Sequence, residues 1–221
     1  EKGMVEGLPA SSGLFALRRI AVEEPLDDFM FDPAYRHLLG SSRDGAGAVV
    51  INLNVGRPIA KVGLEGLPHL GSGITWMRDG HRLLATPHLN RNQLSVIDTT
   101  DWQVIRRIDL LGPAFFMRSH ENSPYAWVDG MLGPRRDTMH IIDKRTFEVV
   151  RTLTPSPGKT AAHVEFSRDG RYALVSIWEM DGELVVYDAN SFTEVKRLKM
   201  VKPSGKYNVY NKITFSEGTS H

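Results

Sequence analysis

The sequence predicts an all-β fold, a β-propeller built from about four four-stranded blades. The first observation is a repeat of aspartates that each end a short apolar strand, 45 residues apart: Asp98, Asp143 and Asp188. The second is an aromatic residue four positions after each aspartate: Trp102, Phe147 and Phe192. Four-stranded units repeating every 40–45 residues are typical of propellers, whereas an open β-sandwich seldom keeps so regular a period.

An earlier copy of the repeat places Asn52 46 residues before Asp98 but lacks the aromatic residue. A further strand precedes each copy, and two of these follow tight turns with an Asp-Gly pair, at residues 78–80 and 168–170. Such pairs are favoured in hairpins because glycine adopts positive φ angles easily. In the second copy the four strands, A to D, are expected at residues 73–77, 82–86, 94–98 and 102–110.

The repeat divides the chain into blades at about residues 25–70, 71–112, 113–157 and 158–215. Four blades are at the small end of known propellers, so we expect half of a ring rather than a closed one. The aromatic residues at the turns between strands C and D are expected to pack between blades.

Composition narrows the classes of function. The chain has 221 residues and a formal charge of +1, which argues against a general nucleic-acid or membrane-surface binder. No apolar run is long enough for a membrane span. The absence of cysteine excludes a disulfide scaffold, a c-type haem attachment and a thiolate metal site within these residues. Because the chain does not begin with methionine, we expect a leader or an upstream domain to have been removed.

The repeat sorts the histidines by face. In an antiparallel meander, the loop that leads into strand A and the loop that leaves strand B lie on the same face of the disc, where propellers build binding sites. His69, His88 and His163 fall in such positions. His120 falls near the turn between strands A and B, and is expected to point to the opposite face or into the wall.

Other loop residues have two interpretations each. Gly71 and Gly73 allow a ligand to approach the backbone closely, or form a plain turn. Basic loop residues can pair with the carboxylates of an anionic ligand, or simply face solvent. These basic residues are Arg43, Arg91, Arg118, Lys159 and Lys206.

Four stretches extend beyond a generic propeller pattern: PHLGSGITW, FFMRSHENSPYAWVD, GKTAAHVEFSRDGRYALVSIW and KPSGKYNVYNK. Together they resemble the haem d1-binding propeller of the cytochrome cd1 nitrite reductase and dihydro-haem d1 dehydrogenase family, and most closely its dehydrogenase branch. The resemblance covers nearly the whole chain. It implies the C-terminal half of an eight-bladed propeller, with a c-type haem domain and the proximal axial histidine on the absent upstream part.

Single residues distinguish the two branches of this family. His69 matches one of two pocket histidines of the nitrite reductases, while Asp27 stands where the second would fall. His163 stands where the reductases have glutamine. By resemblance, His163 is an axial ligand of the haem d1 iron and His69 a candidate catalytic acid or base. The expected cofactor-binding set also includes Gly71, Gly73, Arg118, His120 and Lys159.

The resemblance implies an oxidoreductase that dehydrogenates a propionate side chain of dihydro-haem d1 to an acrylate, the last step of haem d1 biosynthesis for denitrification. Two alternatives stay open: the d1 domain of a nitrite reductase, and a non-catalytic propeller that carries haem d1 or scaffolds its maturation. The expected partners are haem d1 or its dihydro precursor, the missing half or a c-type cytochrome domain, and nitrite reductase. The expected compartment is the periplasm. This chain is not expected to act alone.

Overall fold

The computed structural model describes residues 4–7, 18–45 and 47–208 of the chain. The strands of this part form one two-stranded hairpin and four antiparallel sheets of four strands each, in which neighbours in sequence are neighbours in space. Blade 1 is formed by β3 (Asp28–Phe31), β4 (His37–Ser41), β5 (Ala48–Asn52) and β6 (Arg57–Val62). Blade 2 is formed by β7 (Ile74–Arg78), β8 (His81–Pro87), β9 (Gln93–Asp98) and β10 (Gln103–Asp109).

Blade 3 is formed by β11 (Met117–Ser119), β12 (Tyr125–Asp129), β13 (Met139–Asp143) and β14 (Val149–Leu153). Blade 4 is formed by β15 (Ala161–Phe166), β16 (Tyr172–Ile177), β17 (Glu183–Asp188) and β18 (Glu194–Lys199). A hairpin of β1 (Met4–Gly7) and β2 (Arg18–Ala21) precedes blade 1. In the part of the chain described, no helix has the length and apolar character needed to cross a membrane.

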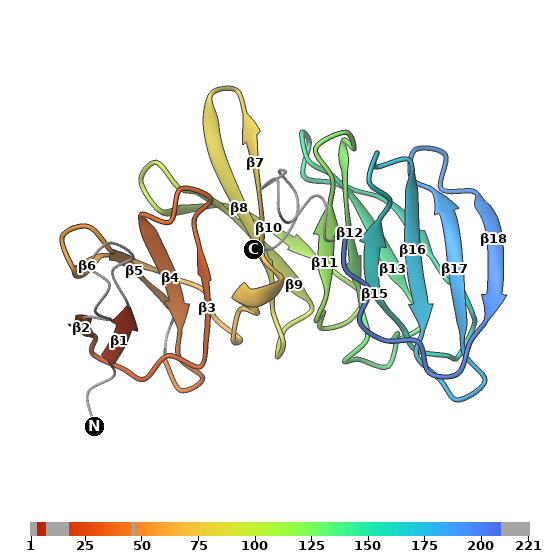
Figure 1. The fold of residues 1–221 in the computed structure, drawn as a ribbon, viewed down its shortest axis with the longest axis horizontal. Helices are drawn as coiled ribbons and strands as arrows, with labels where there is room; N and C mark the ends of the chain where they lie inside the picture. The colour runs from red at the N-terminus through yellow and green to blue at the C-terminus, as the bar shows by residue number, and fades with distance from the viewer. Residues whose placement is uncertain (1–3, 8–17, 46, 209–221) are drawn as a thin grey trace, which may run out of the picture.

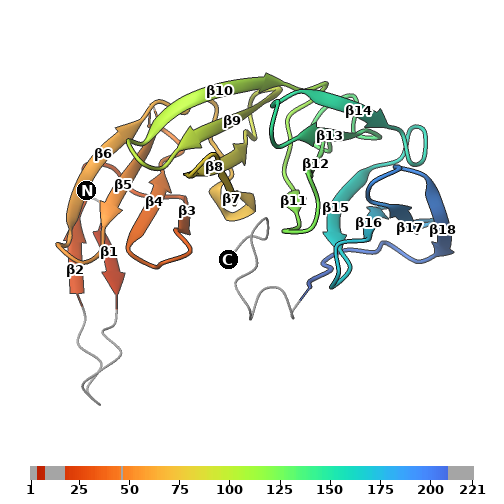
Figure 2. The ribbon, with the colours of Figure 1, turned by 90° about the horizontal axis from the view of Figure 1, so that it is seen from above.

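The four blades stand side by side along an arc (Figures 1 and 2). Seen from above, the first strand of each blade lies on the concave side, and the last strand lies on the outside: β3, β7, β11 and β15 against β6, β10, β14 and β18 (Figure 2). This is the arrangement of propeller blades around an axis. The all-β propeller with four four-stranded blades is confirmed.

The hydrophobic core lies between blades rather than within one. One cluster joins Val50 and Val62 of blade 1 to Leu84 and Trp102 of blade 2. Two further clusters join blade 2 to blade 3 and blade 3 to blade 4. Because each sheet buries its faces against its neighbours, a blade gains most of its apolar burial from the next blade along the chain.

The repeated aspartates and aromatics build the turns between the third and fourth strands. In blade 3, Asp143 Oδ1 accepts hydrogen bonds from the amides of Arg145 and Thr146, at 2.7 and 2.9 Å. The aromatic residue then takes a left-handed backbone, with φ of 60°, 63° and 60° at Trp102, Phe147 and Phe192.

Blade 1 has Gly56, with φ 70°, at the same turn position. A glycine reaches this conformation without steric cost, which accounts for the missing aromatic residue in the first copy of the repeat. Trp102 and Phe147 are buried in clusters shared with the preceding blade, so the prediction of packing between blades is confirmed.

Candidate functional site

His69 lies on the concave side of the arc, at the loop that leads into the first strand of blade 2. It precedes a short 3-10 turn, η1 (Leu70–Ser72), and its backbone amide donates to the carbonyl of Pro87 at 2.8 Å. Its ring nitrogen Nδ1 lies 2.6 Å from Oδ2 of Asp28, the first residue of β3 in blade 1. The His69 ring is therefore held across a junction between two blades.

An aromatic row continues from His69 toward blade 4. The His69 ring contacts Phe115 at a centroid separation of 4.2 Å, and Phe115 contacts Phe116 at 4.6 Å, both with the ring planes tilted against each other. Phe116 in turn lies 4.6 Å from the ring of His163. These four side chains, here called the aromatic row, bring both predicted histidines into one continuous surface that spans blades 2, 3 and 4.

His163 has an unusual backbone. It lies within β15 at φ 50°, where the pairing with β16 shifts register between Ala162 and Glu165. A residue other than glycine in the left-handed region is uncommon and costs free energy, and such residues concentrate at functional sites. The bulge turns the His163 side chain out of the regular alternation of the strand, toward Phe116.

The His163 imidazole is buried, with 5% of the residue exposed. Its Nε2 atom has no hydrogen-bond partner among the described residues. Burial, together with the nearby charges of Lys206 and Arg118, lowers the pKa of His163 to about 4. The ring is therefore neutral at physiological pH and offers one unsatisfied nitrogen.

The segment after blade 4 returns to this site. It runs from the outer strand β18 back beneath β15 (Figure 2). The backbone amide of Lys206 donates to His163 Nδ1 at 3.3 Å, and its ammonium donates to the carbonyl of His163 and to Ser176 Oγ. Burial lowers the pKa of Lys206 to about 8. Tyr207 follows, with its ring 5.5 Å from His163.

A buried carboxylate accepts hydrogen bonds from backbone amides of the aromatic row. Asp129, at the end of β12, is fully buried and accepts hydrogen bonds from the amides of Phe115 and Phe116 at 2.9 and 3.1 Å. The amide of His163 also donates to it. Burial raises the pKa of Asp129 to about 7, against the effect of these amide donors. One side chain thus fixes the backbone of three of the four residues in the row.

Arg118 is buried beside the row, and its guanidinium is already paired. Its Nε lies 3.8 Å from Oε2 of Glu165, and each of these side chains is about a tenth exposed. Burial lowers the pKa of Arg118, and the charge of Glu165 opposes that effect. The structure therefore places this predicted cofactor-binding residue near His163, with its charge directed to a carboxylate of the protein.

The two predicted glycines serve different purposes. The amide of Gly71 donates to Asp28 Oδ1 at 3.1 Å, which ties the 3-10 turn to blade 1. Gly73 is buried, and a Cβ there would lie 2.8 Å from the sulfur of Met30 and 2.9 Å from the carbonyl of Leu70. Gly73 is thus required by close packing of the protein itself.

The structure does not bring His120 into the aromatic row. It is fully buried at the turn between β11 and β12, where Nε2 contacts the carbonyl of Arg168 at 3.1 Å and Nδ1 accepts from the amide of Asn122. Both ring nitrogens are therefore engaged at the junction of blades 3 and 4. Lys159 lies in the loop before β15 and pairs with Asp181 at 2.6 Å.

His88, expected on the same face as His69, is buried in the wall. Its Nδ1 lies 2.5 Å from the carbonyl of Glu65 and its Nε2 lies 2.9 Å from Ser95 Oγ. Burial lowers its pKa. His88 therefore supports the loop that leads to His69 and does not present a free nitrogen.

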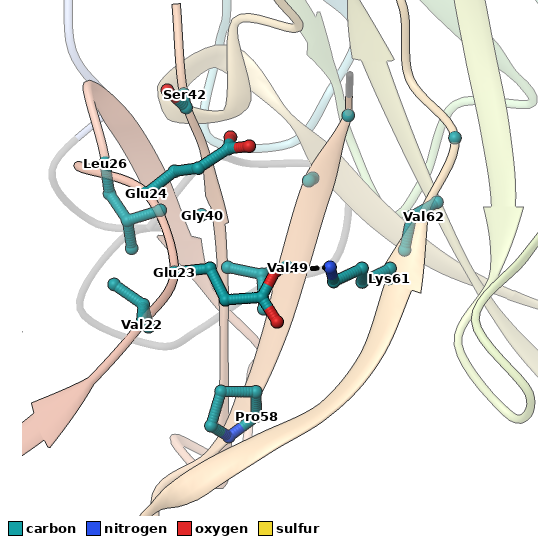
Figure 3. A pocket seen from close by; sticks show the side chains of 13 residues that line it. Val22, Glu23, Glu24, Leu26, Gly40, Ser42, Val49, Pro58, Lys61 and Val62 are labelled. Carbon is teal, nitrogen blue, oxygen red and sulfur yellow. Dashed lines mark hydrogen bonds and ion pairs between the residues drawn. The ribbon is translucent and has the colours of Figure 1, made fainter. Parts of the chain in front are cut away.

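A separate hollow lies on blade 1, away from the aromatic row (Figure 3). Its apolar lining includes Val22, Leu26 and Val49, and the ion pair of Glu23 with Lys61, at 2.5 Å, crosses it. None of the predicted site residues lines this hollow.

Sequence reasoning missed several residues of the site. Asp28, Phe115, Phe116 and Asp129 were not singled out, and Lys206 was considered only as one of several loop cations. The doublets Asp27-Asp28 and Phe115-Phe116 are visible in the sequence, but the repeat gives them no common position. Asp27, which stands in place of a reductase histidine, accepts the amide of Arg43 at 2.5 Å, and its neighbour reaches His69 instead.

Two curated proteins are similar to the chain in sequence. The chain is 57% identical over 215 residues to the "Dihydro-heme d1 dehydrogenase" of Pseudomonas aeruginosa, covering 97% of this chain and 44% of that protein. It is 32% identical over 166 residues to "Protein NirF" of the same organism, covering 75% of this chain and 38% of that protein.

Solved structures give the same result. The structure titled "Dihydro-heme d1 dehydrogenase NirN in complex with DHE" matches with a TM-score of 0.91 and 56% identity, over 95% of this chain and 45% of that one. A hydrazine synthase of Kuenenia stuttgartiensis matches with a TM-score of 0.66 and 16% identity, over 90% of this chain and 54% of that one, and shares the fold alone.

The chain thus spans less than half the length of the curated relatives it matches. A family model described as the cytochrome D1 heme domain matches residues 12–212. The part of the fold that carries the aromatic row therefore lies within the matched region, and the chain belongs to the cytochrome D1 heme domain family.

Proposed function

We propose that this chain forms part of an oxidoreductase that converts a propionate side chain of dihydro-haem d1 to an acrylate, in the last step of haem d1 biosynthesis. The observation that carries the proposal is the aromatic row, with an imidazole at each end and the buried, unpartnered Nε2 atom of His163. The resemblance of the whole chain to a dihydro-heme d1 dehydrogenase supports it.

The residues fit a haem iron on the side of His163. A buried imidazole nitrogen without a partner lacks a hydrogen bond that water or protein normally provides, and a metal ion bound there removes that deficit. Nδ1 accepts the amide of Lys206, which places the proton of the neutral ring on Nε2. To hold a haem iron through Nε2, His163 would have to carry its proton on Nδ1 instead, and its hydrogen bond from the amide of Lys206 would be lost.

His69 is suited to accept a proton. The Asp28 carboxylate accepts the hydrogen of Nδ1, so in the neutral ring Nε2 carries the free lone pair. Within the described residues no group contacts that nitrogen. A histidine with a ring nitrogen that keeps its lone pair can act as a general base.

The remaining requirements concern partners. Forming a C=C bond from a CH2–CH2 unit removes two protons and two electrons, and the macrocycle of the substrate delivers the electrons to an acceptor. We propose that c-type haems, on the upstream half or on a separate cytochrome, accept the two electrons one at a time. The residues of this chain include no cysteine to which such a haem could be attached. A periplasmic location and an association with nitrite reductase belong to the same proposal.

The test uses the native protein that carries these residues, supplied with dihydro-haem d1 and an oxidant. The expected result is loss of two hydrogens from the tetrapyrrole, detected by mass spectrometry, and abolished in His69→Ala. His163→Ala should alter the absorption spectrum of the bound haem. Nitrite turnover would instead favour a reductase, and tight binding with an unchanged tetrapyrrole would favour a carrier.

A further inference from the structure

We infer that Asp28 is a positioning residue for His69: it fixes the tautomer and the orientation of the ring from the neighbouring blade. This inference rests on the proposed function, since it gives a role to a residue that serves the proposed base. The juxtaposition that carries it is the 2.6 Å contact between His69 Nδ1 and Asp28 Oδ2.

Asp28 acts only as a hydrogen-bond acceptor. Oδ1 accepts the amides of Gly71 and Phe29 at 3.1 and 2.8 Å, and Oδ2 faces the His69 ring. A carboxylate can only accept, so the ring must donate through Nδ1. The lone pair needed for proton transfer then lies on Nε2, as in other carboxylate–histidine pairs in which the carboxylate selects the tautomer.

The ring is constrained on two sides. Asp28 binds one edge, and Phe115 covers one face with a centroid separation of 4.2 Å. The Asp28 and His69 side chains are 20% and 18% exposed, so solvent competes weakly with their hydrogen bond. Rotation of the ring about its Cβ–Cγ bond would break the contact with Asp28 and the stacking together.

Asp28→Asn separates positioning from simple loss of volume. An asparagine side chain has one acceptor oxygen where Asp28 uses two. Either the amide of Gly71 or His69 Nδ1 must then face an NH2 group. If the NH2 faces the ring, Nδ1 becomes the acceptor and the proton moves to Nε2, which removes the base.

The matched control is Asp32→Asn. Asp32 follows the same strand β3, and its Oδ2 contacts His37 Nδ1 at 3.1 Å, while its Oδ1 accepts the amides of Arg36 and His37. The chemical change and the local pattern are thus the same. His37 makes an edge-to-face contact with Trp102 and is not part of the aromatic row, so a general effect of weakening an Asp–His pair appears in both variants.

The first measurement needs no substrate. Nitrogen-15 NMR of histidine-labelled native protein, with His69→Gln to assign the signal, should report a neutral His69 protonated on Nδ1. In Asp28→Asn the signal should shift toward the other tautomer, and in Asp32→Asn it should stay in place. A neutral His69 protonated on Nε2 in the native protein would overturn the inference.

The second measurement is turnover of dihydro-haem d1. We expect Asp28→Asn to lower kcat at least about 10-fold with KM changed less than about twofold, because loss of a partner that orients a histidine costs about 10- to 100-fold at metal sites and more in a catalytic triad. Native kcat in Asp28→Asn, with turnover abolished in His69→Ala, would overturn the inference and leave the proposed function intact. Native turnover in His69→Ala would overturn the proposed role of His69 itself.

Discussion

Lys206 binds His163 at two points: its backbone amide donates to the ring nitrogen Nδ1 at 3.3 Å, and its ammonium donates to the His163 carbonyl. A cation is thus fixed beside a buried imidazole that has an unsatisfied nitrogen. Burial favours the neutral form of both side chains, and so lowers the pKa of His163 and of Lys206. The pairing of these two groups determines how the site responds to pH.

Lys206→Met should raise the pKa of His163 from its value of about 4 toward that of a solvated histidine. Burial keeps the pKa low in the variant, but the largest of the neighbouring charges that lower it is gone. An NMR titration of His163 in protein free of haem measures the change. Lys159→Met, which removes a lysine paired with Asp181, should leave the pKa of His163 in place. An unchanged pKa of His163 in Lys206→Met would show that the charge of Lys206 has no effect on the protonation of the ring.

His163 should make the native state less stable in acid. Its folded-state pKa of about 4 lies below the usual 6.5, so between these values the unfolded chain takes up a proton that the folded chain does not. The contribution is absent above pH 6.5 and costs up to about 3 kcal/mol near pH 4. Urea unfolding of native protein and His163→Gln between pH 4 and 7 should show their difference growing in favour of the variant as pH falls. Parallel pH curves would contradict the assignment.

Asp129→Ala should lower the free energy of unfolding by about 3 kcal/mol, because buried amides that lose their acceptor each cost about 1–3 kcal/mol. The amides of Phe115 and Phe116 are the ones affected most directly. Chemical denaturation gives the value. Asp44→Ala, which removes an exposed carboxylate, should stay within about 0.5 kcal/mol of the native protein. Similar values for the two variants would mean that Asp129 is not a structural centre of the row.

The single variant Glu165→Gln should destabilise the folded protein more than the double variant Glu165→Gln/Arg118→Met does. The single change leaves the buried guanidinium of Arg118 without its carboxylate, which costs about 3–5 kcal/mol, whereas replacing both partners removes the charge as well. A double-mutant cycle by thermal unfolding measures the coupling. Additive effects of the two changes would show that the 3.8 Å contact carries no interaction.

At position 147, a glycine variant should be more stable than an alanine variant, which is the reverse of the usual order of stability. The φ of 63° at Phe147 lies in the left-handed region, which costs an L-residue about 1–2 kcal/mol and costs glycine nothing. Phe147→Gly should therefore be about 1 kcal/mol more stable than Phe147→Ala, although both lose the ring. At Val149, on β14, the alanine variant should be the more stable one, as is normal in a strand.

The sequence allowed the blades to be predicted because each strand repeats with the same turn chemistry. Asp98 and Asp143 mark the turns in both sequence and structure, and Gly56 explains the one imperfect copy. The contacts around the histidines could not be predicted in the same way. The contact of Asp28 with His69 joins residues 41 positions apart on different sheets, and periodicity carries no information about such pairs.

The repeat pattern also could not predict the bulge at His163. Strand alternation assigns each side chain to one face, and a single extra residue changes that assignment locally. Sequence placed His163 at the start of a first strand, and the structure places it inside β15 with a positive φ. Its orientation toward Phe116 follows from that local irregularity.

The meander order of the blades has a consequence for biosynthesis of the protein. Three contacts of the site join blades that are consecutive in sequence: Asp28–His69 joins blades 1 and 2, His69–Phe115 joins 2 and 3, and Phe116–His163 joins 3 and 4. Pairings between close neighbours form faster than distant ones, and an emerging chain folds from its N-terminus. The site is therefore completed stepwise during translation, and its last component arrives only when Lys206 has left the ribosome.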